Sequence, residues 1–329
     1  MKEKETTQNI QEKLRVSIGT AVELGLENAR NIVAPTTAYL LLDKGCLGQC
    51  SFCPRNNGNS KELKLSRILW PEFSLPTVLT NLDNFSNRFR RICLQTSYNP
   101  DQESLIKKIT QDLTQSGKPL CVTVHPAQTN FIPSLLESGA EKVGIGLDAA
   151  SKRTYEKHKG RPWENDFEAV LNSIKSFPNK IGIHLIFGLG DSEIDFVKMI
   201  QFLHQAGCSS IALFAFTPTE KSSVMKPPDL SAYRRIQAFR HLNYKRIRMF
   251  ENLVIMDERI SSFGIPESQL IEALLNGEAF QTSGCPDCNR PFYNESPRGI
   301  AYNFPRPLSK EEFFQAVKEM DLKSNLNNF

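Results

Sequence analysis

The chain has 329 residues, of which 40% are hydrophobic, and it carries 40 basic against 36 acidic side chains. This length can bury a large core, as one α/β domain or as two smaller ones. A formal net charge of +4 is too small to favour nucleic acid or an anionic membrane as a partner. Apolar runs stay well below the roughly 20 residues of a membrane span, and residues 1–15 lack the apolar segment of a signal peptide. We therefore expect a reducing cytoplasm, where cysteines bind metal more often than they form disulfides.

Strand and helix patterns alternate along the chain at a spacing of about 30 residues, which predicts a parallel sheet built from βα units. Residues 1–35 come first, and we predict a helical lead-in there that packs against the core. Buried strands are predicted at 37–42, 91–98, 120–125, 142–148, 181–187 and 210–216. Helices are predicted at 79–89, 101–114, 131–138, 164–177, 194–205 and 231–248.

The composition changes after residue 276, where prolines, asparagines and two cysteines replace the periodic pattern. Residues 248–256 before it are a candidate edge strand. Such a segment needs something besides an apolar core to hold it, and a metal site would serve. A capping signal at Ser309 begins a last predicted helix that runs to residue 322. We therefore divide the chain into a lead-in (1–35), an α/β body (36–276) and a C-terminal segment (277–329).

Three cysteines follow the first predicted strand in a C-x3-C-x2-C array, Cys46, Cys50 and Cys53. Three thiolates on a short loop can hold three irons of a [4Fe-4S] cluster and leave the fourth iron open. A zinc ribbon would need a matching C-x2-C and a closed tetrahedron. A disulfide would leave one cysteine of the array unpaired. The spacing therefore favours the cluster.

With the aromatic Phe52 before its last cysteine, this array resembles the signature of the radical SAM superfamily. The resemblance implies a partial (β/α)6 barrel with its active site at the C-terminal ends of the strands. It also implies that the open iron binds the amino and carboxylate groups of S-adenosylmethionine. Reduction by one electron then releases a 5'-deoxyadenosyl radical that removes hydrogen from an unactivated carbon.

The resemblance implies further contacts with S-adenosylmethionine. Gly188 and Gly190 follow the fifth strand and match the glycine-rich adenine motif of the family, although a simple turn explains this G-x-G equally well. Thr217, before a proline, matches a turn that contacts adenine. Gln95 and Thr96 end the second strand, where most members carry Gly-Gly-Glu for the methionine amino group. Their role is therefore inferred from position alone.

Two charged residues, Asp148 and Arg161, each have two possible roles. Asp148 ends the fourth strand, where its carboxylate would accept hydrogen bonds from the ribose or cap a helix N-terminus. Arg161 would clamp the carboxylate of S-adenosylmethionine in a bidentate manner, or lie on the surface.

A second cysteine pair, Cys285 and Cys288, lies in a rigid turn flanked by prolines. Two cysteines are too few for a cluster, and the chain offers Cys93, Cys121 and Cys208 as further ligands. The segments around Cys93 and Cys121 resemble the strands of biotin synthase that carry ligands of its sulfur-donating [2Fe-2S] cluster. They are also ordinary candidates for buried strand cysteines, and we expect Cys208 to be structural.

The chain departs from biotin synthase at two positions. Gly182 or a neighbour stands where a third cysteine is expected, and Gly146 replaces the asparagine that holds the ureido ring. A site without that hydrogen-bond partner should bind the ring poorly. We therefore expect a relative with altered cluster ligands and an altered substrate.

The tail from Cys285 to Arg298 and the stretch at 65–71 are similar to the two-component lipoyl synthase. That resemblance implies two [4Fe-4S] clusters per chain, the second ligated by Cys285 and Cys288, with Cys93 and Cys121 as tentative further ligands. The reaction would insert sulfur at C6 or C8 of an octanoyl chain on a lipoyl-carrier protein, either a lipoyl domain or the glycine cleavage H protein. Expected partners are a second radical SAM subunit and an electron donor such as ferredoxin or flavodoxin. Five polar residues would order the cluster loop or receive the carrier lysine amide: Asn289, Arg290, Asn294, Glu295 and Arg298.

Two other functions stay open. A radical SAM enzyme of the biotin synthase kind would act on a free small molecule. An iron-sulfur carrier or electron-transfer protein would use both cysteine sets only to hold iron, although six βα units and the glycine loop argue against it. The sequence leaves open which carbon is attacked and which subunit acts first.

Overall fold

Six parallel strands form the centre of the fold in a computed structural model, which describes residues 12–55, 64–218 and 225–322. Each neighbouring pair is parallel, in the order β10-β9-β8-β7-β6-β2. The strands are β2 (Thr37–Leu42), β6 (Arg91–Thr96), β7 (Leu120–Val124), β8 (Lys142–Asp148), β9 (Ile181–Phe187) and β10 (Ser210–Ala215). The fold class is therefore α/β with a parallel sheet, as the alternating pattern predicts, and with the partial (β/α)6 barrel that the family resemblance implies.

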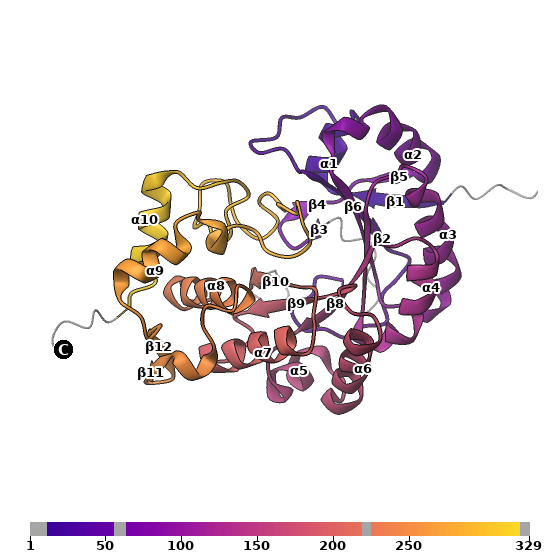
Figure 1. Ribbon diagram of the computed structural model, residues 1–329. Helices are drawn as coiled ribbons and strands as arrows, with labels where there is room; N and C mark the ends of the chain where they lie inside the picture. The colour runs from indigo at the N-terminus through magenta and orange to yellow at the C-terminus, as the bar shows by residue number, and fades with distance from the viewer. Residues whose placement is uncertain (1–11, 56–63, 219–224, 323–329) are drawn as a thin grey trace, which may run out of the picture.

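Helices follow the strands and cover the outside of this sheet (Figure 1). They are α2 (Leu75–Asn84), α3 (Glu103–Thr114), α4 (Ile132–Glu137), α5 (Lys152–Lys159), α6 (Trp163–Ser176), α7 (Glu193–Gln205) and α8 (Leu230–Tyr244). Short 3-10 turns lie at Ser86–Arg88, Pro100–Gln102, Pro126–Phe131 and Phe250–Asn252. α3 buries one apolar stripe with Ile106, Ile109 and Leu113, whereas α8 is buried around most of its circumference.

The helical lead-in is wrong for part of the N-terminal segment. Residues Lys13–Val16 form strand β1, which pairs antiparallel with β2 and with β5 (Glu72–Ser74). Leu14 and Val16 are buried, and Lys13 is exposed, a strand pattern too short to stand out in the sequence. Within residues 12–35, only α1 (Ile18–Glu23) is helical. A hairpin of β3 (Lys64–Leu65) and β4 (Ile68–Leu69) forms a separate two-stranded sheet.

The segment after α8 does not extend the central sheet, contrary to the edge strand expected at 248–256. β11 (Val254–Met256) pairs only with β12 (Arg259–Ser262), and this hairpin packs against α7. α9 (Glu267–Leu274) and a 3-10 turn (Glu278–Phe280) follow. The last helix, α10 (Lys310–Glu319), begins at Ser309 with the expected capping box to Glu312.

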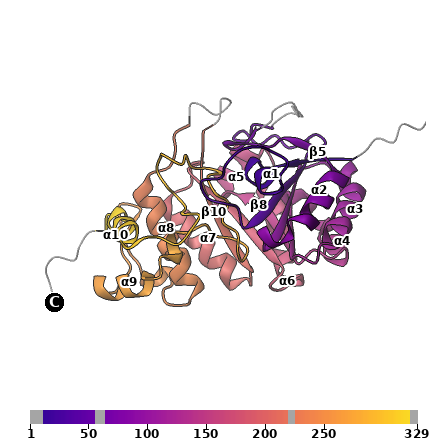
Figure 2. The ribbon, with the colours of Figure 1, turned by 90° about the horizontal axis from the view of Figure 1, so that it is seen from above.

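Residues 283–294 lie across the gap between the two outer strands of the barrel, β10 and β2, and we call them the closing segment. Ser283 accepts a hydrogen bond from the Leu213 amide of β10 at 2.8 Å, and Asn289 accepts one from the Thr36 amide before β2 at 3.0 Å. Thr217 donates to Asn294 O at 2.9 Å. In Figure 2 the yellow loops of this region run beside β10. The barrel is therefore completed by residues far along the chain.

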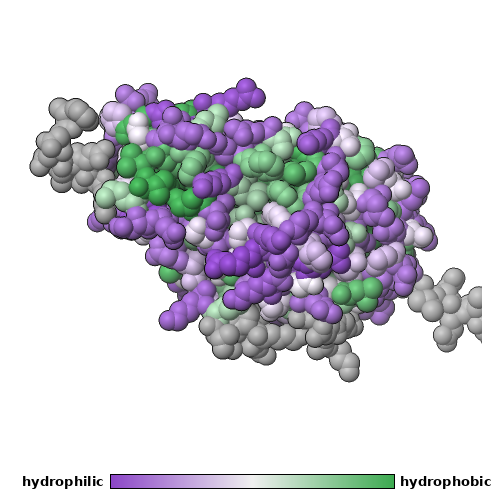
Figure 3. Space-filling view, turned by 90° about the horizontal axis from the view of Figure 1, so that it is seen from below, coloured by the Kyte–Doolittle hydropathy of each residue, from purple (hydrophilic) through white to green (hydrophobic). Residues whose placement is uncertain are grey.

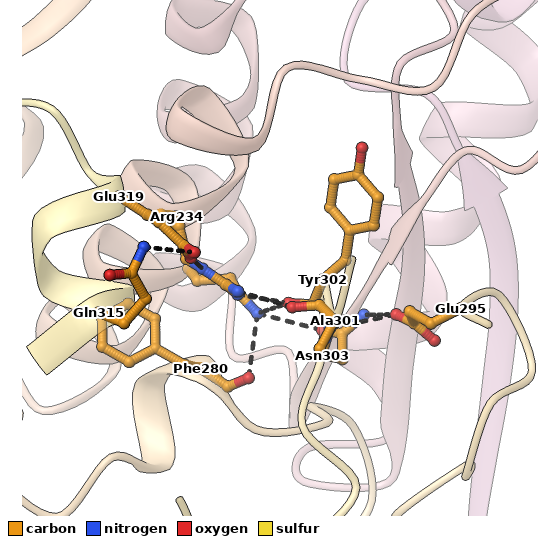
Figure 4. Close-up of polar contacts among 9 residues, drawn as sticks. Arg234, Phe280, Glu295, Ala301, Tyr302, Asn303, Gln315 and Glu319 are labelled. Carbon is orange, nitrogen blue, oxygen red and sulfur yellow. Dashed lines mark hydrogen bonds and ion pairs between the residues drawn. The ribbon is translucent and has the colours of Figure 1, made fainter. Parts of the chain in front are cut away.

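A buried arginine anchors the chain that follows the closing segment. Arg234 of α8 donates to Tyr302 O at 2.7 Å, to Ala301 O at 2.6 Å and to Glu319 of α10 at 2.9 Å. Figure 4 shows these contacts converging from three parts of the chain. The guanidinium thus satisfies backbone carbonyls that have no strand partner.

The surface seen in Figure 3 is mostly hydrophilic, with separate apolar areas. Exposed apolar side chains include Tyr244, Val254, Met256 and Leu275. Among the described residues, every helix is too short or too polar to cross a membrane.

Candidate functional site

The sulfurs of Cys46 and Cys50 face the same space at the turn of the loop after β2. A Cβ atom on Gly48 would lie 3.3 Å from Cys46 Sγ and 3.8 Å from Cys50 Sγ. Cys53 lines the adjoining cavity. Across residues 12–55, 64–218 and 225–322, no three His, Cys, Asp or Glu side chains approach closely enough to hold a single metal ion. A cluster separates its cysteine ligands by its own width, so it does not require the three thiols to meet at one point.

Hydrogen bonds fix the cysteine loop to the barrel at both ends. The Leu47 amide donates to Tyr98 O after β6 at 2.8 Å, and the Ser51 amide donates to His158 O of α5 at 2.8 Å. The Ser51 hydroxyl also contacts His158 Nδ1 at 2.7 Å. The loop is therefore positioned before any ligand binds, as a site on rigid elements requires.

Burial keeps the Cys50 and Cys53 thiols protonated in the metal-free chain. It raises the pKa of Cys53 to about 12, and it raises the pKa of Cys50 against the opposing charge of Lys159. Iron must therefore displace protons when it binds, so iron binding weakens as the pH falls.

Asp148 lies at the C-terminal end of β8 with φ of +67° and lines the cavity. The buried Lys159 donates to its carboxylate at 2.7 Å and to Gly146 O at 2.8 Å. The helix-cap reading of Asp148 is wrong, because Ser151 caps α5 through the Thr154 amide. Its contact with a ribose stays a prediction.

The glycine loop after β9 carries two glycines in the left-handed region. Gly188 has φ of +111°, and a Cβ there would lie 3.0 Å from Phe216 Cβ and 3.1 Å from Pro228 Cδ. Gly190 has φ of +119°. Any other residue would strain both positions. The contact of this loop with adenine stays a prediction.

The remaining predicted contacts divide by where the structure places them. Phe52, Gln95 and Thr217 line the cavity. The Thr96 hydroxyl instead donates to Thr123 O at 2.8 Å, so its predicted ligand contact is not supported. Arg161 is partly buried and pairs with another side chain of the protein.

The guanidinium of Arg161 is held by Asp166 of α6. Nε donates to Oδ2 at 2.7 Å and the second contact to Oδ1 is 2.9 Å. Burial would raise the pKa of Asp166, but hydrogen bonds from Arg161 and Tyr155 outweigh it and lower that pKa. This bidentate pair already uses the fork geometry that a carboxylate ligand needs, so the predicted clamp on S-adenosylmethionine is not supported.

Four cysteines from distant parts of the chain gather around one end of the cavity. Cys93 of β6 and Cys121 of β7 are partners in adjacent strands, and Cys285 and Cys288 come from the closing segment. All four line the cavity. Cys121 donates a hydrogen bond to Cys285, which lowers the pKa of Cys285, and Arg91 lowers it further. The structure therefore brings together the two cysteine pairs that the sequence offers as joint ligands.

Two arginines flank this four-cysteine site, Arg91, which is buried, and Arg290, which is partly buried. Arg290 Nη1 lies 3.6 Å from Cys288 Sγ, and its guanidinium stacks over Phe214 at 4.2 Å. Arg91 donates to Pro286 O at 3.0 Å and pairs with Glu141. Their positive charges compensate the thiolates and anionic cluster that such a site would hold. The sequence did not assign Arg91 a role, although strand alternation from Cys93 places it on the same face.

Tyr39 of β2 joins the closing segment to the barrel at this site. Its hydroxyl lies 3.4 Å from Cys288 Sγ and accepts a hydrogen bond from the Arg290 amide at 2.8 Å. The ring packs against Tyr293 with centroids 4.8 Å apart. Tyr39 was missed in the sequence, where it reads only as part of an apolar strand.

One cavity of about 250 Å³ connects the two cysteine sets. Its walls include Cys53, the four cysteines above and the apolar side chains Leu65, Ile186, Phe214 and Phe216. Cys208 is buried elsewhere, with its sulfur 3.1 Å from Ser210 O, which is consistent with a structural role.

Comparison with known proteins identifies the part of the chain that carries the cysteine loop after β2. Residues 42–203 match the Radical SAM superfamily. The chain belongs to the radical SAM superfamily. The family implies a [4Fe-4S] cluster and S-adenosylmethionine, and the loop of Cys46, Cys50 and Cys53 at the C-terminal end of a barrel strand fits both.

Relatives of this radical SAM enzyme are distant. Biotin synthase from Methanococcus vannielii is 21% identical over 217 residues, which cover 64% of this chain and 64% of that protein. The FeFe-hydrogenase maturase HydG from Carboxydothermus hydrogenoformans has a TM-score of 0.53 and 17% identity, over 87% of this chain and 66% of that one. Methylornithine synthase (PylB) has a TM-score of 0.51 and 14% identity, over 64% of this chain and 63% of that one. The chain thus spans just under two thirds of each of these proteins, and the solved structures support the fold alone.

Proposed function

We propose that this radical SAM enzyme inserts sulfur into the octanoyl chain of a lipoyl-carrier protein, together with a second radical SAM protein. The observation that carries the proposal is the four-cysteine site, which shares one cavity with Cys53. Four thiolates can ligate a second [4Fe-4S] cluster, and such a cluster is the sulfur source that the reaction needs.

The cavity suits a reaction in which a substrate carbon meets both sites in turn. When bound, the first cluster and S-adenosylmethionine supply one-electron chemistry that removes a hydrogen atom from carbon. The protein's own part is to hold the chain between Cys53 and the four-cysteine site and to exclude water and other hydrogen donors.

Apolar walls favour an alkyl substrate over a polar ring. Leu65, Ile186, Phe214 and Phe216 face the cavity, and Gly146 presents no side chain that would bind a ureido group. The C-x2-C tail, similar to that of the two-component lipoyl synthase, supports an octanoyl chain on a carrier lysine. The carrier, the partner subunit and a ferredoxin- or flavodoxin-type donor belong to the same proposal, as does a reducing cytoplasm that keeps the thiols free.

The second candidate is sulfur insertion into a free small molecule, and the match to biotin synthase favours it. A panel of octanoylated carrier protein, octanoyl-lysine peptide and dethiobiotin would separate the two candidates. A cluster carrier without catalysis is the third reading, and S-adenosylmethionine that fails to bind would favour it.

The direct test is the iron and sulfide content of the chain after anaerobic reconstitution. We expect about eight irons in the native chain and about four in Cys285→Ala/Cys288→Ala, because only one [4Fe-4S] cluster remains. Cys208→Ala is the matched control, since Cys208 is buried outside both sites, and it should keep about eight. About four irons in both the native chain and the double variant would remove the sulfur source and refute sulfur insertion.

A further inference from the structure

Lys159 is a buried lysine at the C-terminal end of α5, where the helix meets the cysteine loop after β2. Only 3% of its surface is exposed. The residues on either side of it contact the loop. The Ser51 amide donates to His158 O at 2.8 Å. A Cβ on Gly160 would lie 3.8 Å from Gln49 Cβ. A lysine is seldom this buried unless its charge is paired, so its surroundings indicate what it does.

The Lys159 ammonium holds the end of β8 in an irregular conformation. Nζ donates to Gly146 O at 2.8 Å and to Asp148 Oδ2 at 2.7 Å. Between these two acceptors the pairing of β8 with β9 shifts register. Asp148 has φ of +67°, a left-handed conformation that few residues other than glycine adopt. Asp148 lines the cavity that Cys53 also lines. Lys159 therefore fixes a carboxylate, and its own charge, at the edge of that cavity.

The ion pair of Lys159 acts on two thiols of the cysteine loop with a net positive sign. Burial lowers the pKa of Lys159, but Asp148 and then Cys50 outweigh it and raise that pKa, so the ammonium stays charged. Burial raises the pKa of Cys50, and Lys159 opposes that rise more strongly than Asp148 adds to it. Burial also raises the pKa of Cys53, and Lys159 again opposes the rise. The cation of the pair therefore has the larger effect on these thiols.

The other ionisable groups that interact with Lys159 do not cancel its charge. Burial lowers the pKa of His125 to about 2 and the pKa of His184 to about 4, so both imidazoles are neutral at pH 7. The Asp166 carboxylate is held in the bidentate pair with Arg161, and that pair is neutral as a whole. Lys159 thus places a buried positive charge beside the cysteine loop.

We propose that Lys159 makes the cluster on the cysteine loop easier to reduce. In the step concerned, an external one-electron donor loses an electron and the cluster gains it, so the site takes up one negative charge and no proton moves. A buried cation stabilises that added charge, because Coulomb interactions strengthen as the local dielectric constant falls. The potential of an iron-sulfur cluster depends on such charges and on burial. This role follows from membership of the radical SAM superfamily and holds for either candidate substrate.

A redox titration followed by electron paramagnetic resonance would measure the effect. Every chain, including the reference, carries Cys285→Ala and Cys288→Ala, so that the signal comes from the cluster on the cysteine loop. In Lys159→Met the ratio of reduced to oxidised cluster at a fixed solution potential should fall about tenfold, which for one electron is a shift of about 59 mV to more negative potential. Lys152→Met is the matched control on the same helix, because its side chain is 56% exposed and pairs with Glu164. Its ratio should stay within about twofold of the reference.

Three further variants separate the charge of Lys159 from its hydrogen bonds. Asp148→Asn removes the carboxylate alone and should raise the ratio about threefold, because the ammonium is then unopposed. Lys159→Met/Asp148→Asn removes both charges and should lie between Lys159→Met and the reference. Lys159→Gln keeps a donor for Asp148 without the charge, and its ratio should fall as that of Lys159→Met does. The titrations contain no S-adenosylmethionine, so the ribose contact predicted for Asp148 does not affect them.

Two results would overturn this role of Lys159. One is a Lys159→Met or Lys159→Gln chain that titrates at the reference potential, and the other is an Asp148→Asn chain whose ratio does not rise. Iron content and circular dichroism show whether each chain is loaded and folded. If Lys159→Met takes up no iron, Lys159→Gln and Asp148→Asn decide the question by their opposite signs. The iron count of the four-cysteine site is a separate measurement, so the proposed function can fail while this role stands.

Discussion

Replacing Arg234 with methionine would test whether one buried guanidinium holds the chain around the four-cysteine site. The side chain donates to two carbonyls, Ala301 O and Tyr302 O, and to Gln237 Oε1 at 2.9 Å. It also pairs with Glu319 at 2.9 Å. Methionine keeps much of the length and the packing but supplies no donor.

The cost follows from which acceptors lose their partner. Tyr302 O keeps a hydrogen bond from Gln237 Nε2 at 2.9 Å, and Glu319 is partly exposed, so water can replace the ion pair. Ala301 O and Gln237 Oε1 lose the donor that Arg234 provides. The buried Gln237 Oε1 and the partly buried Ala301 O, left without a donor, cost about 1–3 kcal/mol each, and removing a desolvated charge returns part of this. We expect a net loss of about 3 kcal/mol in the free energy of unfolding.

Urea unfolding of the iron-free chain, followed by circular dichroism, would measure the loss, and amide exchange across residues 295–304 would locate it. Arg306→Met is the matched control, because its pair with Glu312 is half exposed and should contribute at most about 1 kcal/mol. The double variant Arg234→Met/Gln237→Met should lose less than the sum of the single losses, since it removes an acceptor together with its donor. An Arg234→Met chain within about 0.5 kcal/mol of the native chain would refute the reasoning.

Two further predictions concern the ligand loop and the pH dependence of stability. Gly188→Ala should weaken S-adenosylmethionine binding at least about tenfold in anaerobic calorimetry, because φ is +111° and the methyl group meets Phe216 and Pro228. Burial, with Lys245, lowers the pKa of His241 to about 4. Unfolding therefore takes up a proton between about pH 6.5 and 4, so stability falls as the pH drops through that window, and His241→Asn should flatten the fall.

Each of these has its own control. Gly117→Ala introduces a similar strain at φ of +68° with no atom within 4 Å, and it should leave S-adenosylmethionine binding unchanged. If Gly188→Ala binds as tightly as Gly117→Ala, the glycine loop has no part in the ligand site. For His241, urea midpoints measured at several pH values should diverge from those of the native chain below about pH 6.5. Parallel curves would contradict the assigned pKa.

The central strands could be read from the sequence because both of their faces are buried. β2 has the predicted bounds Thr37–Leu42, and all six of its residues are buried. A buried parallel strand gives a continuous apolar run, which is a strong signal. β1 spans only four residues, Lys13–Val16, and its pairing with β5 involves residues about 60 positions later. No local pattern contains that contact.

The candidate site was predictable where chemistry depends on spacing and unpredictable where it depends on packing. Cys46, Cys50 and Cys53 could be predicted as cluster ligands from their spacing. The sequence predicted that Arg161 binds a ligand. Its pairing with Asp166 depends on how α5 and α6 pack, which the sequence does not show. Gln95 and Thr96 are neighbours in a strand, so their side chains face opposite sides of the sheet. Only the register of the folded sheet shows which of the two faces the cavity.

The closing segment has a consequence for how the molecule is made. Asn289 and Thr36 are 253 residues apart in the chain and are joined by a hydrogen bond. On a growing polypeptide the six strands are complete by residue 215, yet two of the four thiols around the inner cavity have still to be synthesised. The loop of Cys46, Cys50 and Cys53 can therefore be loaded with iron during synthesis, whereas the four-cysteine site exists only after nearly the whole chain has left the ribosome. If both sites take up iron, the position of Cys285 and Cys288 in the sequence makes the four-cysteine site the later one to be filled.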